Sequence, residues 1–374
     1  MGFVLTEEQQ ILRSSAGEYF NDRLPVSALR QLRDTNSERG YDTATWAEMA
    51  DMGWAGILVP EDHGGVAFGY RGLGEVLEAG GRTLAASPLI STALTAAPLI
   101  AALGSESQQA SLLQPIAAGE AIVALALDEG AKHAPDSIST TAVQKDGAYV
   151  INGDKRFIVD GHVADVLIVA TRVSDGRAAL FLIERARAGV TIRRRSMVDA
   201  RNCADIEFRD VRVSSADMLG EPGAVQAELE RVLDGARAGV AAEMLGAGLE
   251  AFERTVAYLK VREQFDVPIG SFQALKHRAA LMFCELELTK SAVAAALNAL
   301  DNNSEDRAAL VSLAKAKAGD MLELVTNEAV QLHGGIGMTD EAEIGLFLKR
   351  ARVQQQLFGD SGFHRARYAG LMGF

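Results

Sequence analysis

The pattern of hydrophobic residues changes character twice along the 374-residue chain, and these two changes limit the possible folds more than any other feature. Residues 1–118 follow helical periodicity. Residues 119–220 form short β-rich runs separated by turn signals, and helical periodicity returns over residues 221–374. The sequence therefore predicts an α+β multidomain fold with an N-terminal helical domain, a central β-sandwich or barrel domain, and a C-terminal four-helix bundle.

The helical patterns at the two ends have recognisable limits. The first begins with Thr6 as a predicted N-cap, and the last four cover residues 224–263, 271–300, 304–334 and 340–358. No glycine-rich phosphate-binding motif follows a predicted strand. This argues against a Rossmann-type dehydrogenase and against a P-loop NTPase.

Composition narrows the possible partners. The formal net charge of −13 argues against nucleic acid, and no apolar run reaches the ~20 residues that a membrane helix needs. Cys203 and Cys284 are too few and too far apart for a disulfide framework or a metal site, which indicates a cytoplasmic protein without a bound metal. The start "MGFVLT" matches a myristoylation signal at Gly2 only weakly, so no lipid anchor is expected.

Two C-terminal segments combine features that suit a phosphate-containing ligand. In "VREQFDVPIGSFQALKHR" (261–278), Arg262 ends one helical pattern. An arginine at such a corner can bind a phosphate through two parallel hydrogen bonds, or it can face solvent near the helix dipole. In "QLHGGIG" (331–337), Gly334 and Gly335 let the backbone approach a ligand closely, or they cap the helix.

Four segments, in this order, resemble the acyl-CoA dehydrogenase family: "WAEMADMGWAGILVPEDHGG", "YVINGDKRFIVDG", "REQFDVPIGSFQ" and "QLHGGIG". The resemblance covers nearly the whole chain. It implies a flavoprotein that uses FAD to convert an acyl-CoA thioester to a 2-enoyl-CoA and passes electrons to an electron-transfer flavoprotein. It also implies a homotetramer, with FAD held between the β domain and the bundle and partly across a subunit interface.

The same resemblance assigns FAD contacts. Arg262 is expected at the FAD pyrophosphate with Phe265 beside it, and Gln273 and residues 331–335 at the adenosine-diphosphate end from the neighbouring subunit. The predicted FAD contacts are Arg262, Phe265, Gln273, Gln331, Leu332, His333, Gly334, Gly335, Phe157 and Val159.

The β domain departs from the family pattern at the flavin. The stretch "LDEGAKHAPD" (127–136) stands where the family usually has "TEPGAGSD", and its serine is missing. Phe157-Ile158-Val159 replaces the usual W-I-T. An aromatic ring at 157 can still cover one face of the flavin, whereas Val159 offers only its backbone amide.

The joint after the last bundle helix lacks the usual catalytic glutamate. Many family members have Tyr-Glu-Gly-Thr there, but "LFGDS" places Gly359 or Phe358 at the glutamate position. In the alternative family motif D-x-E-R, here "LDGAR", Ala236 replaces the glutamate and Arg237 is retained. We expect Arg237 and Gly359 to contact the substrate.

Two carboxylates are candidates for the catalytic base that removes the α-proton. Glu243 lies two helical turns after Ala236 in an apolar stretch, and Asp360 lies in the joint itself. A buried ion pair is the alternative role for Glu243, and a turn or N-cap is the alternative role for Asp360.

The leading interpretation is FAD-dependent α,β-dehydrogenation of an acyl-CoA thioester. The first alternative is a non-catalytic or base-deficient subunit of a heteromeric acyl-CoA dehydrogenase, which the missing glutamate favours. The "FGD" joint resembles small subunits of pimeloyl-CoA-type and steroid side-chain-type dehydrogenases, some of which assemble with a homologous chain. A flavin monooxygenase or desaturase of the same fold, which needs no such base, is the second alternative.

Overall fold

The structure is a computed structural model and describes residues 4–374, so Gly2 lies outside the described residues. The chain forms two compact units that are each assembled from separate segments. The first contains the N-terminal segment as far as Gln31, together with Tyr70–Ala85 and Arg237–Phe374. The second contains Leu32–Gly69 and Ala86–Ala236.

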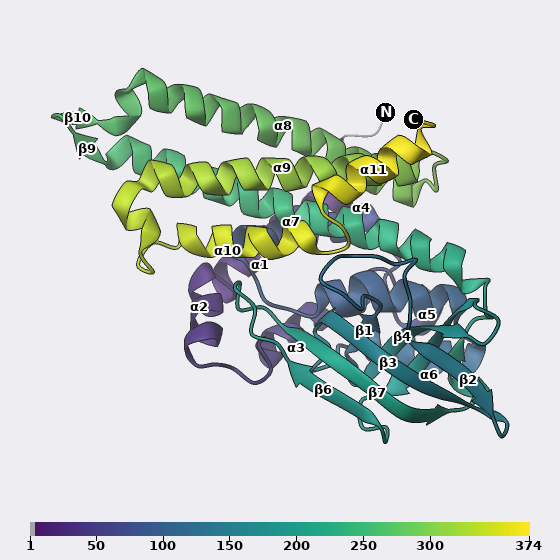
Figure 1. Cartoon of the computed structure of the whole chain (residues 1–374). Coiled ribbons are helices and arrows are strands. Elements are labelled where there is room, and N and C mark those ends of the chain that lie inside the picture. Colours follow the sequence, from purple (N-terminus) through teal and green to yellow (C-terminus); the bar gives the residue numbers. More distant parts are fainter. Residues whose placement is uncertain (1–3) are drawn as a thin grey trace. The chain divides into compact units, whose positions relative to one another are not determined.

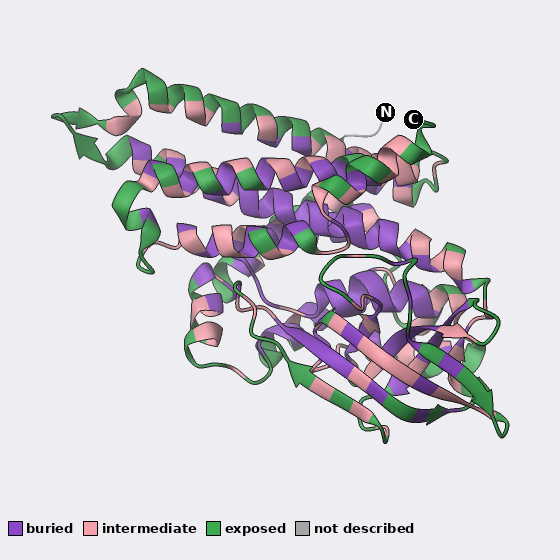
Figure 2. Cartoon of the chain, in the orientation of Figure 1, coloured by how far each residue is buried: buried purple, intermediate pink, exposed green. Residues whose placement is uncertain are grey.

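The first unit is helical. Its first helix has the predicted N-cap, because the Thr6 hydroxyl accepts the backbone N–H of Gln9 while the Gln9 side chain binds the backbone of Thr6. The long helix α7 enters this unit at Arg237 and is buried along most of its length, whereas much of α8 is exposed (Figure 2). The helices are α1 (Glu7–Arg23), α4 (Gly69–Thr83), α7 (Val225–Val261), α8 (Gln273–Asp301), α9 (Arg307–His333), α10 (Ile344–Gln356) and α11 (Ser361–Leu371).

Two glycines let α4 and α7 cross closely within this unit. A Cβ atom added to Gly81 would lie 2.1 Å from the Glu243 carbonyl oxygen, and one added to Gly246 would lie 1.9 Å from the Glu78 carbonyl oxygen. No side chain fits at these distances, so the crossing requires glycine on both helices.

The second unit contains a mixed eight-stranded sheet. Seven strands follow the order β6-β7-β3-β2-β4-β5-β8, and β1 pairs with β4 off this path. Figure 1 labels β1, β2, β3, β4, β6 and β7 of this sheet. The β1–β4 and β2–β4 pairs are parallel, and the others are antiparallel. The strands are β1 (Val123–Ala126), β2 (Thr141–Lys145), β3 (Ala148–Val159), β4 (Val166–Val173), β5 (Ala178–Glu184), β6 (Val190–Arg194), β7 (Cys203–Val213) and β8 (Met218–Leu219).

Helices pack beside this sheet within the second unit. Helix α3 is capped by Asp42, and its Trp46 donates its indole N–H to the Gly119 carbonyl 2.9 Å away. A π-helical segment lies against β1, where the Thr92 hydroxyl bonds the backbone of Val123. These elements are α3 (Thr43–Asp51), η1 (Glu61–His63), η2 (Leu89–Ala96), α5 (Ala97–Leu103), α6 (Glu106–Ala117) and η3 (Ser215–Asp217).

The predicted α+β architecture is confirmed, with helices before and after a central β domain. Several elements were not predicted. Helix α2 (Val26–Asp34) and strand β7 were missed, and the predicted helical region before the β domain includes a π-helix, η2, ahead of the short helix α5. The domain boundaries at 118 and 220 stay a prediction.

Candidate functional site

The two predicted phosphate-binding segments lie at the same end of the helical unit. The hairpin of β9 (Glu263–Gln264) and β10 (Val267–Pro268), η4 (Ile269–Ser271), the start of α8 and the end of α9 come together there (Figure 1). The Tyr258 ring of α7 stacks on the His333 ring of α9 with 4.5 Å between centroids. This ring stack holds the end of α7, which carries Arg262, beside the glycine segment at the end of α9.

Arg262 presents a free cation at this corner. Its side chain is exposed and makes no hydrogen bond or ion pair within residues 4–374. Phe265, in the hairpin, is 87% exposed and meets Phe272 edge-to-face at 6.1 Å. An exposed guanidinium beside an exposed aromatic ring suits an anionic, aromatic ligand.

The glycine segment leaves open space at the end of α9. Gly334 has φ +66°, and a Cβ atom on Gly335 would meet nothing within 4 Å. Packing within the chain therefore does not require glycine at 335, whereas close approach of a ligand would. His333 donates from Nδ1 to the Ala329 carbonyl at 2.7 Å, so Nε2 is the ring nitrogen left to meet a ligand. The segment continues as the 3₁₀ turn η5 (Gly334–Met338).

The remaining predicted contacts at this end differ in exposure. Gln331 is exposed, and so is Gln273, whose side-chain amide lies 3.0 Å from His277. The Leu332 side chain is buried in the bundle, so only its backbone is available to a ligand.

The joint between α10 and α11 is held by a buried lysine. Lys315 of α9 is 1% exposed, and its ammonium donates to the carbonyls of Gln354, Gln355 and Gly359 at 3.2, 3.3 and 2.9 Å. Two of these carbonyls belong to the last turn of α10, where backbone acceptors have no partner within the helix. Lys315 thus caps α10 and fixes the joint.

Arg237 and His364 hold the other side of the joint. Both are fully buried, and they contact the Phe358 carbonyl at 3.4 and 3.1 Å. Burial, together with the charges of Lys315 and Arg237, lowers the pKa of His364 to about 2, so its ring is neutral and donates from Nε2. Gly359 has φ +106°, and a Cβ atom there would lie 2.4 Å from the Phe363 ring and 2.9 Å from His364 Nε2, so glycine is required.

The two candidate carboxylates differ in accessibility. Glu243 is buried, and both its oxygens lie 2.9 Å from one nitrogen of Arg350. Asp360 is partly exposed; one of its oxygens accepts the Phe363 N–H at 2.7 Å as the N-cap of α11. Both contacts match the structural alternatives left open by the sequence, and a catalytic role for either stays a prediction.

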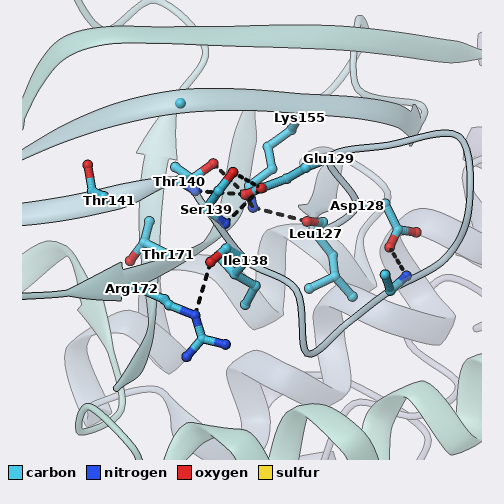
Figure 3. Close-up of polar contacts among 12 residues, drawn as sticks. Leu127, Asp128, Glu129, Ile138, Ser139, Thr140, Thr141, Lys155, Thr171 and Arg172 are labelled. Carbon is cyan, nitrogen blue, oxygen red and sulfur yellow. Dashed lines mark hydrogen bonds and ion pairs between the residues drawn. The ribbon is translucent and has the colours of Figure 1, made fainter. Parts of the chain in front are cut away.

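In the second unit, the loop that replaces the usual flavin loop is held by an ion pair between the partly buried Glu129 and the fully buried Lys155 (Figure 3). Glu129 accepts from Lys155 Nζ at 2.8 Å, from the Thr140 hydroxyl at 2.6 Å and amide at 2.9 Å, and from the Ser139 amide at 2.7 Å. Burial alone would raise its pKa, but the bonds from Lys155, Ser139 and Thr140 lower the pKa of Glu129 to about 2. The carboxylate is therefore ionised at neutral pH.

The predicted flavin contacts Phe157 and Val159 lie at the end of β3. Phe157 is 37% exposed and has φ +55°, and Val159 pairs with Cys203 of β7. Residue 157 therefore presents an aromatic ring at the surface of this unit.

Three domain models of one protein family match almost the whole chain. The acyl-CoA dehydrogenase N-terminal domain matches residues 6–120, the middle domain 127–211 and the C-terminal domain 225–371. The chain belongs to the acyl-CoA dehydrogenase family. Its members are FAD-dependent flavoproteins that act on CH–CH bonds, which confirms the predicted enzyme class and cofactor.

Individual acyl-CoA dehydrogenases match over nearly their full length. The probable acyl-CoA dehydrogenase YngJ of Bacillus subtilis is 30% identical, with 98% of each chain covered. Acyl-CoA dehydrogenase IpdE2 of Mycobacterium tuberculosis is 31% identical over 94% of this chain and 93% of its own. The solved structure of a variant of the Tcur3481-Tcur3483 steroid ACAD has a TM-score of 0.88 at 29% identity, covering 98% of each chain.

Sequence reasoning on this acyl-CoA dehydrogenase foresaw the buried Glu243 but missed Lys315 and the Glu129–Lys155 pair. Lys315 lies in phase with Val311, Ala318 and Leu322 on the apolar face of α9, and a lysine in that phase could have indicated a buried role. The Glu129–Lys155 pair joins residues 26 positions apart and has no local signal. Within residues 4–374, no helix is long and apolar enough to cross a membrane.

The burial of Lys315 predicts a pH dependence of stability. Burial lowers the pKa of Lys315 to about 7. The positive charge of Arg237 lowers this pKa further, whereas the negative charge of Asp360 opposes the shift. Above pH 7 the unfolded chain binds this proton and the folded chain does not, so the free energy of unfolding rises with pH. Relative to Lys315→Met, the wild type should gain about 1 kcal/mol between pH 7 and 8, as measured by urea denaturation. Parallel pH profiles of the two proteins would contradict this.

Proposed function

We propose that this acyl-CoA dehydrogenase binds the diphosphate of FAD at the Arg262 corner and converts an acyl-CoA thioester to a 2-enoyl-CoA. The observation that carries the proposal is the pairing of an unpartnered, exposed guanidinium with a glycine segment whose Gly335 has no packing reason to be glycine. An arginine fork beside a glycine backbone that a ligand can approach closely fits a diphosphate.

Other exposed residues at this end of the helical unit are available for further contacts with FAD. Gln273, Gln331 and the His333 Nε2 atom can meet the adenosine-diphosphate end, with Phe265 beside it. Phe157 and the Val159 backbone are assigned to the isoalloxazine ring. When bound, FAD supplies the acceptor for the hydride that leaves the β-carbon.

We assign the removal of the α-proton to Asp360. Asp360 is partly exposed, and its single hydrogen bond occupies one oxygen, so the other remains available. Glu243 is less suited, because it is buried with both oxygens bound to Arg350. Arg237 and Gly359 then act by holding the joint that carries Asp360, and any direct contact of theirs with substrate stays a prediction.

We propose that the enzyme works as a homotetramer or as a heteromer with a homologous chain. Apolar side chains at 38–56% exposure lie on α8 and at its start, and a second chain would cover them. They are Phe272, Leu281, Phe283 and Leu288. We expect an electron-transfer flavoprotein to reoxidise the flavin, and a cytoplasmic location stays a prediction.

Absorbance of the purified protein tests the proposed activity. We expect a yellow protein whose flavin band bleaches with at least one of a panel of straight-chain, branched and cyclic acyl-CoAs. The alternative, a base-deficient subunit, is not favoured by the family matches, although Phe358 and Gly359 stand at the family's glutamate position. A protein that bleaches only after mixing with a homologous chain would establish that candidate instead.

Arg262→Gln should weaken FAD binding about tenfold, because one charged, bidentate contact is lost. Arg262→Lys should recover part of the affinity, since it keeps the charge without the fork. Lys260→Gln removes an exposed charge two residues away and provides the matched control. Fluorescence titration of the apoprotein with FAD measures all four dissociation constants. Equal effects of the 260 and 262 substitutions would contradict a specific diphosphate contact.

A further inference from the structure

The exposed ring of Phe157 is presented by a β-bulge. Lys155 pairs with Ile206 and Ile158 pairs with Ala204, so two residues of β3, Arg156 and Phe157, face the single Asp205 of β7. The left-handed backbone at Phe157, with φ +55°, is unfavourable for a phenylalanine. Bulges of this kind often redirect a side chain beside a functional site.

Asp205 holds the bulge in place. This carboxylate is 6% exposed and accepts the Phe157 N–H at 3.3 Å, Arg156 Nη1 at 2.9 Å and the Arg195 guanidinium. Burial alone would raise its pKa, but the bonds from Arg195 and Arg156 lower the pKa of Asp205. The ionised carboxylate thus fixes the backbone of Phe157 and the position of Arg195 together.

Arg195 lies over the ring of Phe157. Its guanidinium carbon is 5.1 Å from the ring centroid, within the range of a cation–π contact. One face of the ring is thereby backed by a positive charge while the side chain stays partly open to solvent. A flat group that stacks on the other face of the ring lies close to the Arg195 cation. Its binding energy therefore depends on the charge that the stacked group carries.

We propose that Asp205 and Arg195 make Phe157 a positively backed platform for the isoalloxazine ring of FAD, and that Arg195 stabilises the reduced, anionic flavin relative to the oxidised, neutral one. This inference rests on the proposed function, in which Phe157 lies against the flavin. Arg195 is therefore a positioning and tuning residue, because it acts through the Phe157 ring. The same charge affects the oxidised flavin little, since that form is neutral.

The reduction potential of the bound flavin tests the inference without any substrate. Arg195→Gln should weaken binding of reduced FAD relative to oxidised FAD about tenfold, which corresponds to a potential about 30 mV more negative for this two-electron couple. Arg195→Lys should lie close to the wild type. Arg193→Gln is the matched control, because Arg193 is an exposed arginine two residues away that pairs with Glu207 instead.

Potentials are measured by equilibration with a reference dye, and dissociation constants of oxidised FAD are measured by fluorescence. The shift should shrink at high salt, because the Arg195 side chain is 43% exposed and screened. Equal potentials for Arg195→Gln and Arg193→Gln in yellow proteins would overturn the inference and leave the proposed function intact. A wild-type protein that binds no FAD would overturn both.

Discussion

Asp360→Asn is expected to slow the bleaching of the flavin by an acyl-CoA at least about 100-fold, which is the usual contribution of a general base. Asparagine caps a helix about as well as aspartate, so α11 and the fold should persist. Stopped-flow absorbance under saturating acyl-CoA measures the rate, and urea denaturation checks the stability. The expected pattern is a large loss of rate with little loss of stability.

Glu243→Gln is the comparison variant, because Glu243 is the other candidate for the catalytic base. Its partner Arg350 is 3% exposed, so the substitution leaves a buried guanidinium without its carboxylate. We expect a loss of several kcal/mol of stability with bleaching retained in the folded fraction. Bleaching lost in Glu243→Gln and kept in Asp360→Asn would assign the base to Glu243. Unchanged bleaching in both would assign the base to another chain, as in a heteromer.

Glu129→Gln is expected to lower the free energy of unfolding by about 3 kcal/mol at pH 7, because it leaves the fully buried Lys155 ammonium without a charged partner. The folded-state pKa of Glu129, about 2, lies below its ordinary value of 4.5. The stabilisation is therefore complete above pH 4.5 and is lost as the pH falls toward 2. The difference between wild type and variant should shrink over the same interval.

Two controls isolate this pair. The double variant Glu129→Gln with Lys155→Met removes both charges and should recover at least about 1 kcal/mol. Glu207→Gln removes an exposed partner of Arg193 and should cost less than about 1 kcal/mol. Guanidinium is unsuitable here because it screens charge, so urea titrations at several pH values are the measurement. A pH-independent difference would exclude the ion pair as the cause.

Local patterns in the sequence predicted most of the fold. The N-cap at Thr6 and the helices α7 to α10 are where periodicity placed them, because these signals involve residues three or four positions apart. Strand β7 was missed because its charges obscure an alternation in which Ile206 and Phe208 are buried. That two-residue period was present in the sequence.

The chemistry of the site was less predictable for a physical reason. Lys315 meets carbonyls about 40 positions away, and Asp205 binds a backbone N–H on another strand, so both roles arise only when distant segments pack together. The family resemblance gave the enzyme class and the cofactor. The residue-level contacts to FAD and the identity of the base stay predictions.

Three phenylalanines share a backbone conformation that phenylalanine rarely adopts. Phe157 in the bulge, Phe265 in the hairpin and Phe358 in the joint all have φ +55°. At roughly 1–3 kcal/mol each, their combined strain is comparable with the ~5–15 kcal/mol that separates folded from unfolded proteins. Glycine or asparagine at these positions would relax the chain, yet a bulky ring is kept at all three. Substitution of these phenylalanines by glycine or asparagine should therefore raise the melting temperature. Each such substitution would also remove a ring from a predicted ligand-binding segment.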